Sequence, residues 1–146
     1  MTIAEHHIEP LTIFASTQNL QLVRSYVERH INTLDFTEFE QNGIVLAVDE
    51  AVSNLIRHAY RGDASKSISI RLRIDDESVH VHITDTADAF DPATAELPDM
   101  RRYFMDHRRG GLGILLMTRV MDNLIYEPAQ GGNGANTLTL TKRRNR

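Results

Sequence analysis

Cysteine and tryptophan are absent from this sequence, and proline occurs only four times. Without cysteine, the chain has no disulfides, no thiolate nucleophile and no cysteine-ligated zinc site. Long apolar runs are also lacking, since no stretch approaches the roughly 18 consecutive apolar residues that a membrane-spanning helix needs. The first residues, MTIAEHHIEP, do not have the charged and then apolar pattern of a secretory signal. We therefore expect a cytoplasmic protein that does not enter a membrane.

The size and charge of the chain are those of one ordinary globular domain. It has 146 residues, of which 41% are apolar and 25% charged, and no internal repeat or low-complexity linker divides it. The formal net charge of -4 argues against a general nucleic-acid-binding protein. We therefore predict a single domain spanning residues 1–146, without direct nucleic-acid contacts.

Helical spacing of apolar residues marks two segments near the N-terminus. Residues 17–31 have apolar side chains at helical intervals, and residues 37–60 have one broad apolar face. Thr37 and Glu40 have the spacing of a capping box, in which each side chain bonds the backbone N–H of the other residue. The sequence therefore predicts two helices, the second of which begins next to Thr37.

Alternating apolar residues predict strands on both sides of these helices. Residues 9–16 and 137–143 alternate, and residues 68–83 have the pattern of a β-hairpin that turns at DDES. Residues 113–126 have helical spacing, whereas the long stretch from residue 85 to 109 has no clear period. This order predicts an α+β fold, a two-layer α/β sandwich with a mixed, mostly antiparallel sheet and the helices on one face.

Glu50, Asn54 and His58 follow one another at intervals of four residues in the second predicted helix. On an α-helix these positions lie along one stripe, at the border of the apolar face. A carboxylate and a carboxamide one turn apart can hold a hard cation such as Mg²⁺, which takes oxygen ligands. The same spacing is also typical of an ordinary polar helix edge, so the spacing alone leaves both interpretations open.

Three further features are candidates for ligand contacts. Asp85 ends the predicted hairpin, where its carboxylate could accept a hydrogen bond from an exocyclic amine or cap a turn. Residues 110–113, GGLG, precede a predicted helix, and free N–H groups at a helix N-terminus attract anions. Two arginines immediately upstream would add positive charge. His80 and His82 share a strand face, as in a two-histidine metal site, but without a third ligand an outward polar face is favoured.

Taken in order, three stretches resemble the sequence boxes of a known family. DEAVSNLIRHAY, ITDTADAFDP and RRGGLGILLMTRVMDNLIYE are similar to the N, G1 and G2 boxes of the GHKL ATPase superfamily. They are most similar to those of the anti-sigma-factor serine/threonine-protein kinases. The resemblance implies a Bergerat-type ATP-binding fold with an ATP lid at about residues 91–110, which would account for the long aperiodic stretch.

The resemblance also implies roles for individual residues, with ATP and Mg²⁺ as cofactors. Glu50 would be the catalytic residue that orients or deprotonates the attacking hydroxyl group, and Asn54 would bind Mg²⁺. Asp85 would bind the adenine amino group, and Thr137 would help to hold the base. The remaining ATP contacts would come from the G1 and G2 boxes, at Ala87, Ala89, Arg109, Gly110, Gly111, Leu112 and Gly113.

The function implied by the resemblance is that of an ATP-dependent protein-serine/threonine kinase that is also an anti-sigma factor. It would phosphorylate a small anti-anti-sigma (antagonist) protein and sequester a sigma factor, and a homodimer is compatible with the family. An alternative is a regulatory module that binds nucleotide weakly or not at all and acts through protein contacts. The ATPase half of a histidine kinase fits less well, because 146 residues leave no room for a dimerisation helix pair with a phosphoacceptor histidine.

Ala87 and Ala89 depart from the pattern of the family's G1 box, which has glycine at the first place and often glycine, proline or serine at the second. We predict that Ala87→Gly raises ATP affinity, because a methyl group there either strains the backbone by roughly 1 kcal/mol or crowds the adenine. Titration calorimetry with ATP and Mg²⁺ measures the difference. An unchanged or lower affinity would mean that the alanine is harmless.

Overall fold

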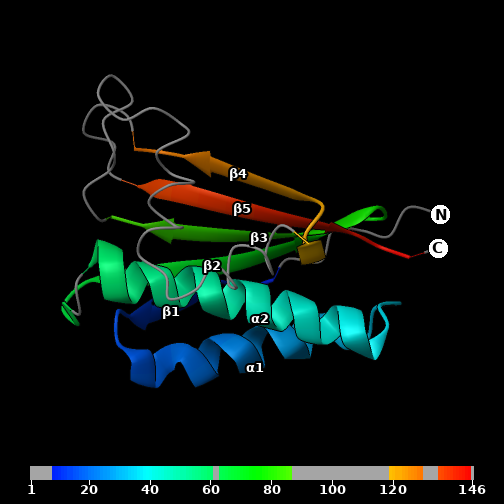
Figure 1. Cartoon of the computed structure of the whole chain (residues 1–146), viewed down its shortest axis with the longest axis horizontal. Coiled ribbons are helices and arrows are strands. Elements are labelled where there is room, and N and C mark those ends of the chain that lie inside the picture. Colours follow the sequence, from blue (N-terminus) through cyan, green and yellow to red (C-terminus); the bar gives the residue numbers. More distant parts are fainter. Residues whose placement is uncertain (1–7, 61–62, 87–118, 130–134, 146) are drawn as a thin grey trace.

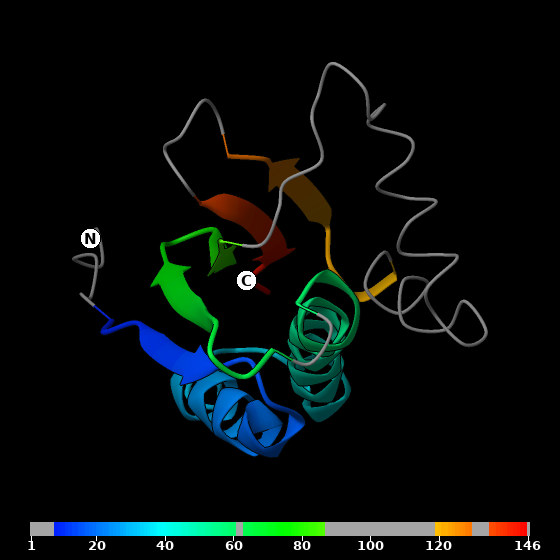
Figure 2. The same ribbon diagram turned by 90° about the vertical axis from the view of Figure 1, so that its left-hand side faces the viewer.

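The computed structural model describes residues 8–60, 63–86, 119–129 and 135–145. These residues form two layers, a five-stranded sheet and a pair of helices that cover one of its faces (Figure 1, Figure 2). The helices are α1 (Leu20–Ile31) and α2 (Glu38–Asn54), and the strands are β1 (Leu11–Phe14), β2 (Ser67–Ile74), β3 (Ser78–Asp85), β4 (Asn123–Glu127) and β5 (Asn136–Arg143). The predicted α+β two-layer sandwich is therefore confirmed.

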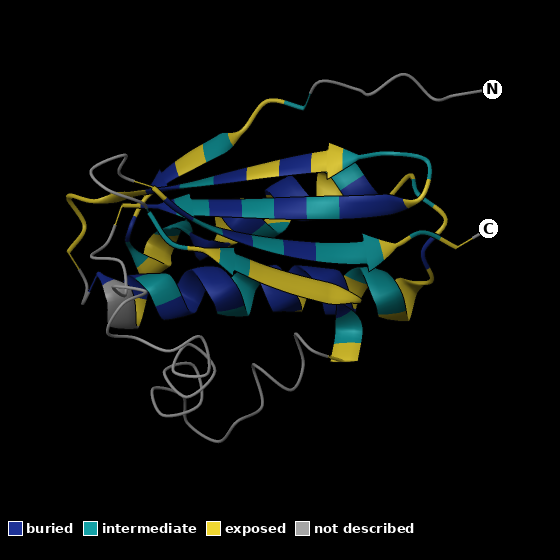
Figure 3. Cartoon of the chain, turned by 90° about the horizontal axis from the view of Figure 1, so that it is seen from above, coloured by how far each residue is buried: buried dark blue, intermediate teal, exposed yellow. Residues whose placement is uncertain are grey.

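The sheet has the order β1-β2-β3-β5-β4, and each of the four pairings among the described strands is antiparallel. Along the three central strands, apolar side chains alternate with polar ones, and the apolar ones are buried against the helices (Figure 3). The opposite face is polar and remains open among the described residues. The predicted hairpin is confirmed, since β2 and β3 pair along their whole length on either side of the DDES turn.

α2 begins as the sequence predicts. The hydroxyl of Thr37 accepts the backbone N–H of Glu40 at 3.1 Å, and the Glu40 carboxylate accepts the backbone N–H of Thr37 at 2.9 Å. This reciprocal pair satisfies two of the N–H groups that a helix start leaves without partners. None of the described helices combines the length and apolar composition that a bilayer crossing needs.

The prediction of one helix over residues 113–126 is wrong at its C-terminal end. Arg119 and Val120 are helical, but Asn123–Glu127 form the edge strand β4, which pairs antiparallel with β5. The backbone N–H of Asp122 donates to the carbonyl of Thr141 at 2.8 Å and so joins the strand ladder one residue earlier. The apolar residues of β4 suit a strand as well as a helix. Here they form a strand because they pair with the edge of β5.

Gly43 lies in the middle of α2, where Val120 packs directly against the helix backbone. A Cβ atom at position 43 would lie 2.9 Å from one methyl carbon of Val120 and 3.0 Å from the other. Glycine costs about 1 kcal/mol relative to alanine inside a helix. The close approach of Val120 explains why a glycine is accommodated there.

Gly43→Ala should therefore destabilise the protein, because overpacking costs about 1–3 kcal/mol and exceeds the gain in helix propensity. Val120→Ala removes both methyl groups that the new side chain would strike. In urea unfolding, we expect the double variant to lose less free energy of unfolding than the sum of the losses of the two single variants. Stabilisation by Gly43→Ala alone would contradict the contact with Val120.

Candidate functional site

The predicted site segments converge at one end of the sheet. α2 ends at Asn54, β3 ends at Asp85, and β5 begins at Asn136 directly opposite Asp85. This end lies at the left in Figure 1 and faces the viewer in Figure 2. Binding residues often lie where rigid elements give way to loops. The arrangement therefore brings the predicted Mg²⁺-binding and adenine-binding residues to the same end of the two layers.

Asp85 and Asn136 form a buried pair at this end. Their exposed fractions are 4% and 1%, and the Nδ2 atom of Asn136 donates to Oδ1 of Asp85 at 2.9 Å. The Oδ1 atom of Asn136 in turn accepts the backbone N–H of Ala129 at 2.9 Å. Both ends of the carboxamide are thus used, which fixes its orientation. The carboxylate of Asp85 is consequently held as an acceptor at the end of β3.

Asn54 is buried as well, with 7% of its surface exposed. Its Nδ2 atom has no hydrogen-bond partner in the part of the chain that the structure describes. An unmade bond of this kind costs about 1–3 kcal/mol, and a ligand or an ordered water is the usual explanation. Glu50 lies one helical turn earlier and is half-buried. This pair of oxygen donors fits Mg²⁺, which prefers carboxylate and carbonyl oxygens.

The α-helical spacing ends at Asn54, and Leu55–Ala59 form one π-helical turn. The turn closes with a hydrogen bond of 2.9 Å from the backbone N–H of Tyr60 to the carbonyl of Leu55. A π-helical turn has more residues than an α-helical one, so it changes the angular position of each residue that follows. The expectation of one α-helical stripe that continues from Glu50 through His58 is therefore wrong.

Thr137 lies on the other face of the sheet from Asp85. It pairs with Thr84 across β3 and β5, whereas Asn136 shares the buried face with Asp85. Asn136 is therefore the residue of β5 that contacts the carboxylate, although the resemblance pointed to Thr137. The strand pattern indicates this position, because Asn136 lies two and four residues before the buried Leu138 and Leu140 and so on the same face of the strand.

The predicted phosphate contacts, the altered G1 positions and the whole of the predicted lid lie outside the described residues. The phosphate contacts and G1 positions comprise Ala87, Ala89, Arg109, Gly110, Gly111, Leu112 and Gly113. Their roles remain predictions from the resemblance.

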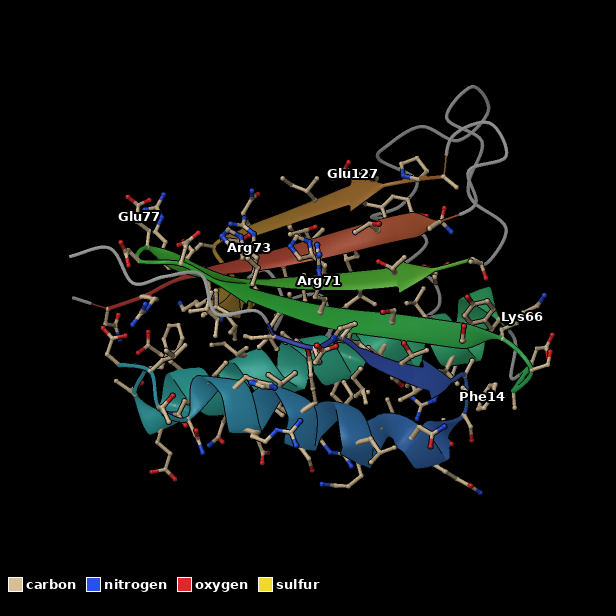
Figure 4. The ribbon with its side chains drawn as sticks, turned by 180° about the vertical axis from the view of Figure 1, so that it is seen from behind. Phe14, Lys66, Arg71, Arg73, Glu77 and Glu127 are labelled. Carbon is tan, nitrogen blue, oxygen red and sulfur yellow. The ribbon has the colours of Figure 1, made fainter. Side chains whose placement is uncertain are left out.

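His80 and His82 lie on the open face of the sheet, close to Arg71 and Arg73 of β2 (Figure 4). His80 bonds Thr141 and Asp75, at 3.0 and 3.1 Å, and His82 bonds a threonine hydroxyl of β5 at 3.0 Å. Burial, followed by the positive charges of the two arginines, lowers the pKa of His82. Within the described ranges no three potential ligands gather as a metal site would require. The predicted polar face is confirmed.

Sequence comparison places this geometry among known proteins. The profile of the histidine kinase-like ATPase domain matches residues 13–142. The serine/threonine-protein kinase BtrW of Bordetella bronchiseptica is 37% identical over 98 residues, which make up 67% of this chain and 67% of BtrW. The anti-sigma F factor of Clostridium botulinum is 31% identical over 117 residues, which make up 80% of this chain and 82% of that protein.

A solved structure supports the same fold. The RsbU and RsbW domains of a Mycobacterium tuberculosis protein superpose with a TM-score of 0.60 and 20% sequence identity. The superposition covers 95% of this chain and 33% of that chain. At this identity the likeness establishes the two-layer fold and nothing finer.

Asn136→Ala should lower the free energy of unfolding by about 1–3 kcal/mol, because the Asp85 carboxylate loses a donor and the N–H of Ala129 loses an acceptor. Urea unfolding measures the loss. Asn123→Ala is the matched control, since Asn123 is exposed on β4 and its side chain accepts the neighbouring N–H of Leu124. We expect that control to stay within about 0.5 kcal/mol of the wild type. Equal losses from both changes would contradict the importance of the pair.

Proposed function

The chain belongs to the histidine kinase-like ATPase domain family, and on this basis we propose that it is an ATP-dependent protein-serine/threonine kinase that also acts as an anti-sigma factor. A relative named as a serine/threonine-protein kinase and another named as an anti-sigma factor support the two halves of the proposal. Its substrate would be a serine or threonine of a small antagonist protein. Its second partner would be a sigma factor, held in a stoichiometric complex.

The observation that carries the proposal is the buried pair of Asp85 and Asn136. A carboxylate that is sheltered from water and oriented by a fixed donor is suited to accept a hydrogen bond from the adenine amino group. A carboxylate in this position would also repel a carbonyl oxygen, which guanine has in place of that amino group. The pair therefore supports a site that selects ATP.

The opposite part of the proposed site is the end of α2. Asn54 would hold Mg²⁺ through its carboxamide oxygen, and the ion when bound would neutralise charge on the phosphates of the nucleotide. Glu50 would orient the attacking hydroxyl group of the substrate and accept its proton. Its half-buried position leaves part of the carboxylate open to an approaching side chain. The remaining work of phosphoryl transfer is positioning, which a rigid helix end can supply.

The phosphates themselves would be bound by residues 109–113, as the resemblance implies. Three glycines and the positive end of the helix that the sequence predicts after them suit three negatively charged groups. Thr137 would help to hold the base, although it lies on the opposite face of β5 from Asn136. Arg109 would add charge to the phosphate contacts.

We predict that the wild type binds ATP only with Mg²⁺ and transfers the labelled γ-phosphate to a co-encoded antagonist protein. Asn54→Ala should remove the Mg²⁺ dependence of ATP binding and lower the transfer rate by about 100-fold, since a metal contact supplies several kcal/mol of charge stabilisation. Calorimetry with and without Mg²⁺ measures the first effect, and transfer of radioactivity measures the second.

Ser53→Ala is the matched control for that change. Ser53 is also buried in α2, but consecutive helix positions point about 100° apart, so its side chain is directed away from the proposed site. Its ATP binding and transfer rate should equal those of the wild type. If the wild type gives no heat with ATP at millimolar concentration, the kinase proposal fails and a module that acts through protein contacts alone replaces it.

A further inference from the structure

Tyr60 is a buried residue at the junction between the end of α2 and the sheet. Only 6% of its surface is exposed. Its backbone N–H closes the π-helical turn on Leu55, and its carbonyl accepts the N–H of Asp63 at 2.9 Å. Both backbone polar groups of Tyr60 are therefore hydrogen-bonded, and its ring belongs to the main hydrophobic core.

The hydroxyl of Tyr60 joins two strand ends. It donates to the carbonyl of Ser67, the first residue of β2, at 3.0 Å. It also accepts the backbone N–H of Thr86, the residue directly after β3, at 2.7 Å. One phenol can make both bonds at once, because it has one proton to donate and lone pairs to accept with. The hydroxyl of Thr86 lies farther away, at 3.4 Å.

The second of these bonds fixes the backbone next to Asp85. Thr86 follows Asp85, so its N–H belongs to the same peptide unit as the Asp85 carbonyl. Asn136 orients the side chain of Asp85 from β5, and Tyr60 holds the adjoining backbone from the end of α2. Two independent contacts from different elements thus determine where the carboxylate lies.

We propose that Tyr60 is a positioning residue for recognition of the nucleotide base. Through the N–H of Thr86 it holds Asp85 at the distance and angle at which the carboxylate meets the adenine amino group. The inference rests on the proposed function, in which Asp85 binds adenine. It adds that base selection depends on a hydroxyl group at the end of α2, although that hydroxyl does not touch the nucleotide.

The test compares two nucleotides that differ only at the group that Asp85 is proposed to read. ATP carries the 6-amino group, and purine riboside triphosphate lacks it. The wild type should prefer ATP by about tenfold or more, because a hydrogen bond to a charged group is worth that much. Tyr60→Phe should reduce this preference by about fivefold, by weakening ATP alone. Calorimetry in Mg²⁺ gives both affinities at a temperature at which circular dichroism shows each variant to be folded.

Tyr26→Phe is the matched control. Tyr26 is equally buried, at 4% exposed, and its hydroxyl also joins two segments, donating to the carbonyl of Glu9 at 2.8 Å and accepting the N–H of Leu72 at 3.4 Å. Leu72 pairs with Val81, which lies four residues and roughly 13 Å before Asp85 along β3. The control therefore loses a comparable pair of hydrogen bonds away from the site, and its preference for ATP should not change.

The outcomes separate this inference from the proposed function. If the wild type binds neither nucleotide, or binds both equally, the proposed role of Asp85 fails. If the wild type prefers ATP and Tyr60→Phe keeps that preference, or weakens both nucleotides by the same factor, only the role of Tyr60 is overturned. A loss of preference in Tyr60→Phe but not in Tyr26→Phe supports the positioning role.

Discussion

The buried carboxylate of Asp85 is the constraint on which this end of the fold depends. A carboxylate removed from water is tolerated only where donors are directed at it, and Asn136 supplies one across the β3–β5 ladder. The register of β5 is consequently not free to slip. A shift of one residue would exchange Asn136 for Thr137 and turn each side chain of the strand to the opposite face. The hydrophobic alternation of β5 and the polar pair at its start therefore require the same register.

α2 links this constraint to the core. The helix starts at a capping box, buries its middle against the sheet, and ends at two buried polar residues, Ser53 and Asn54. Close packing at Gly43 lets Val120 approach the backbone, so the chain that leads into β4 is anchored on the same helix. Packing of the helix places Asn54, whose Nδ2 atom lacks a hydrogen-bond partner among the described residues. The core thus sets the geometry of a group that is left available for a ligand.

Much of this arrangement could be predicted from the sequence, and two exceptions, β4 and the π-helical turn, depend on contacts between distant segments. The capping box and the hairpin depend on local spacing and on hydrophobic phase, which a sequence displays. β4 could not be separated from a helix, because its apolar residues suit both and the choice depends on pairing with β5. The π-helical turn after Asn54 ends at Tyr60, whose hydroxyl bonds the ends of β2 and β3, and local spacing does not display such contacts. For the residue of β5 near the base, the resemblance indicated Thr137, whereas the alternation of the strand places Asn136 beside Asp85.

The two ends of the proposed nucleotide site rest on different parts of the chain. In the proposal, base recognition depends on Asp85 and on two residues that support it, Asn136 and Tyr60, which lie at the ends of a strand and a helix. Phosphate binding is predicted on residues 109–113, far along the sequence. Ala87 lies two residues after Asp85, so this departure from the family pattern bears on the base and not on Asn54 or Glu50. Selectivity for the base and the rate of phosphate transfer should therefore be separable, because the groups proposed for each lie on different elements.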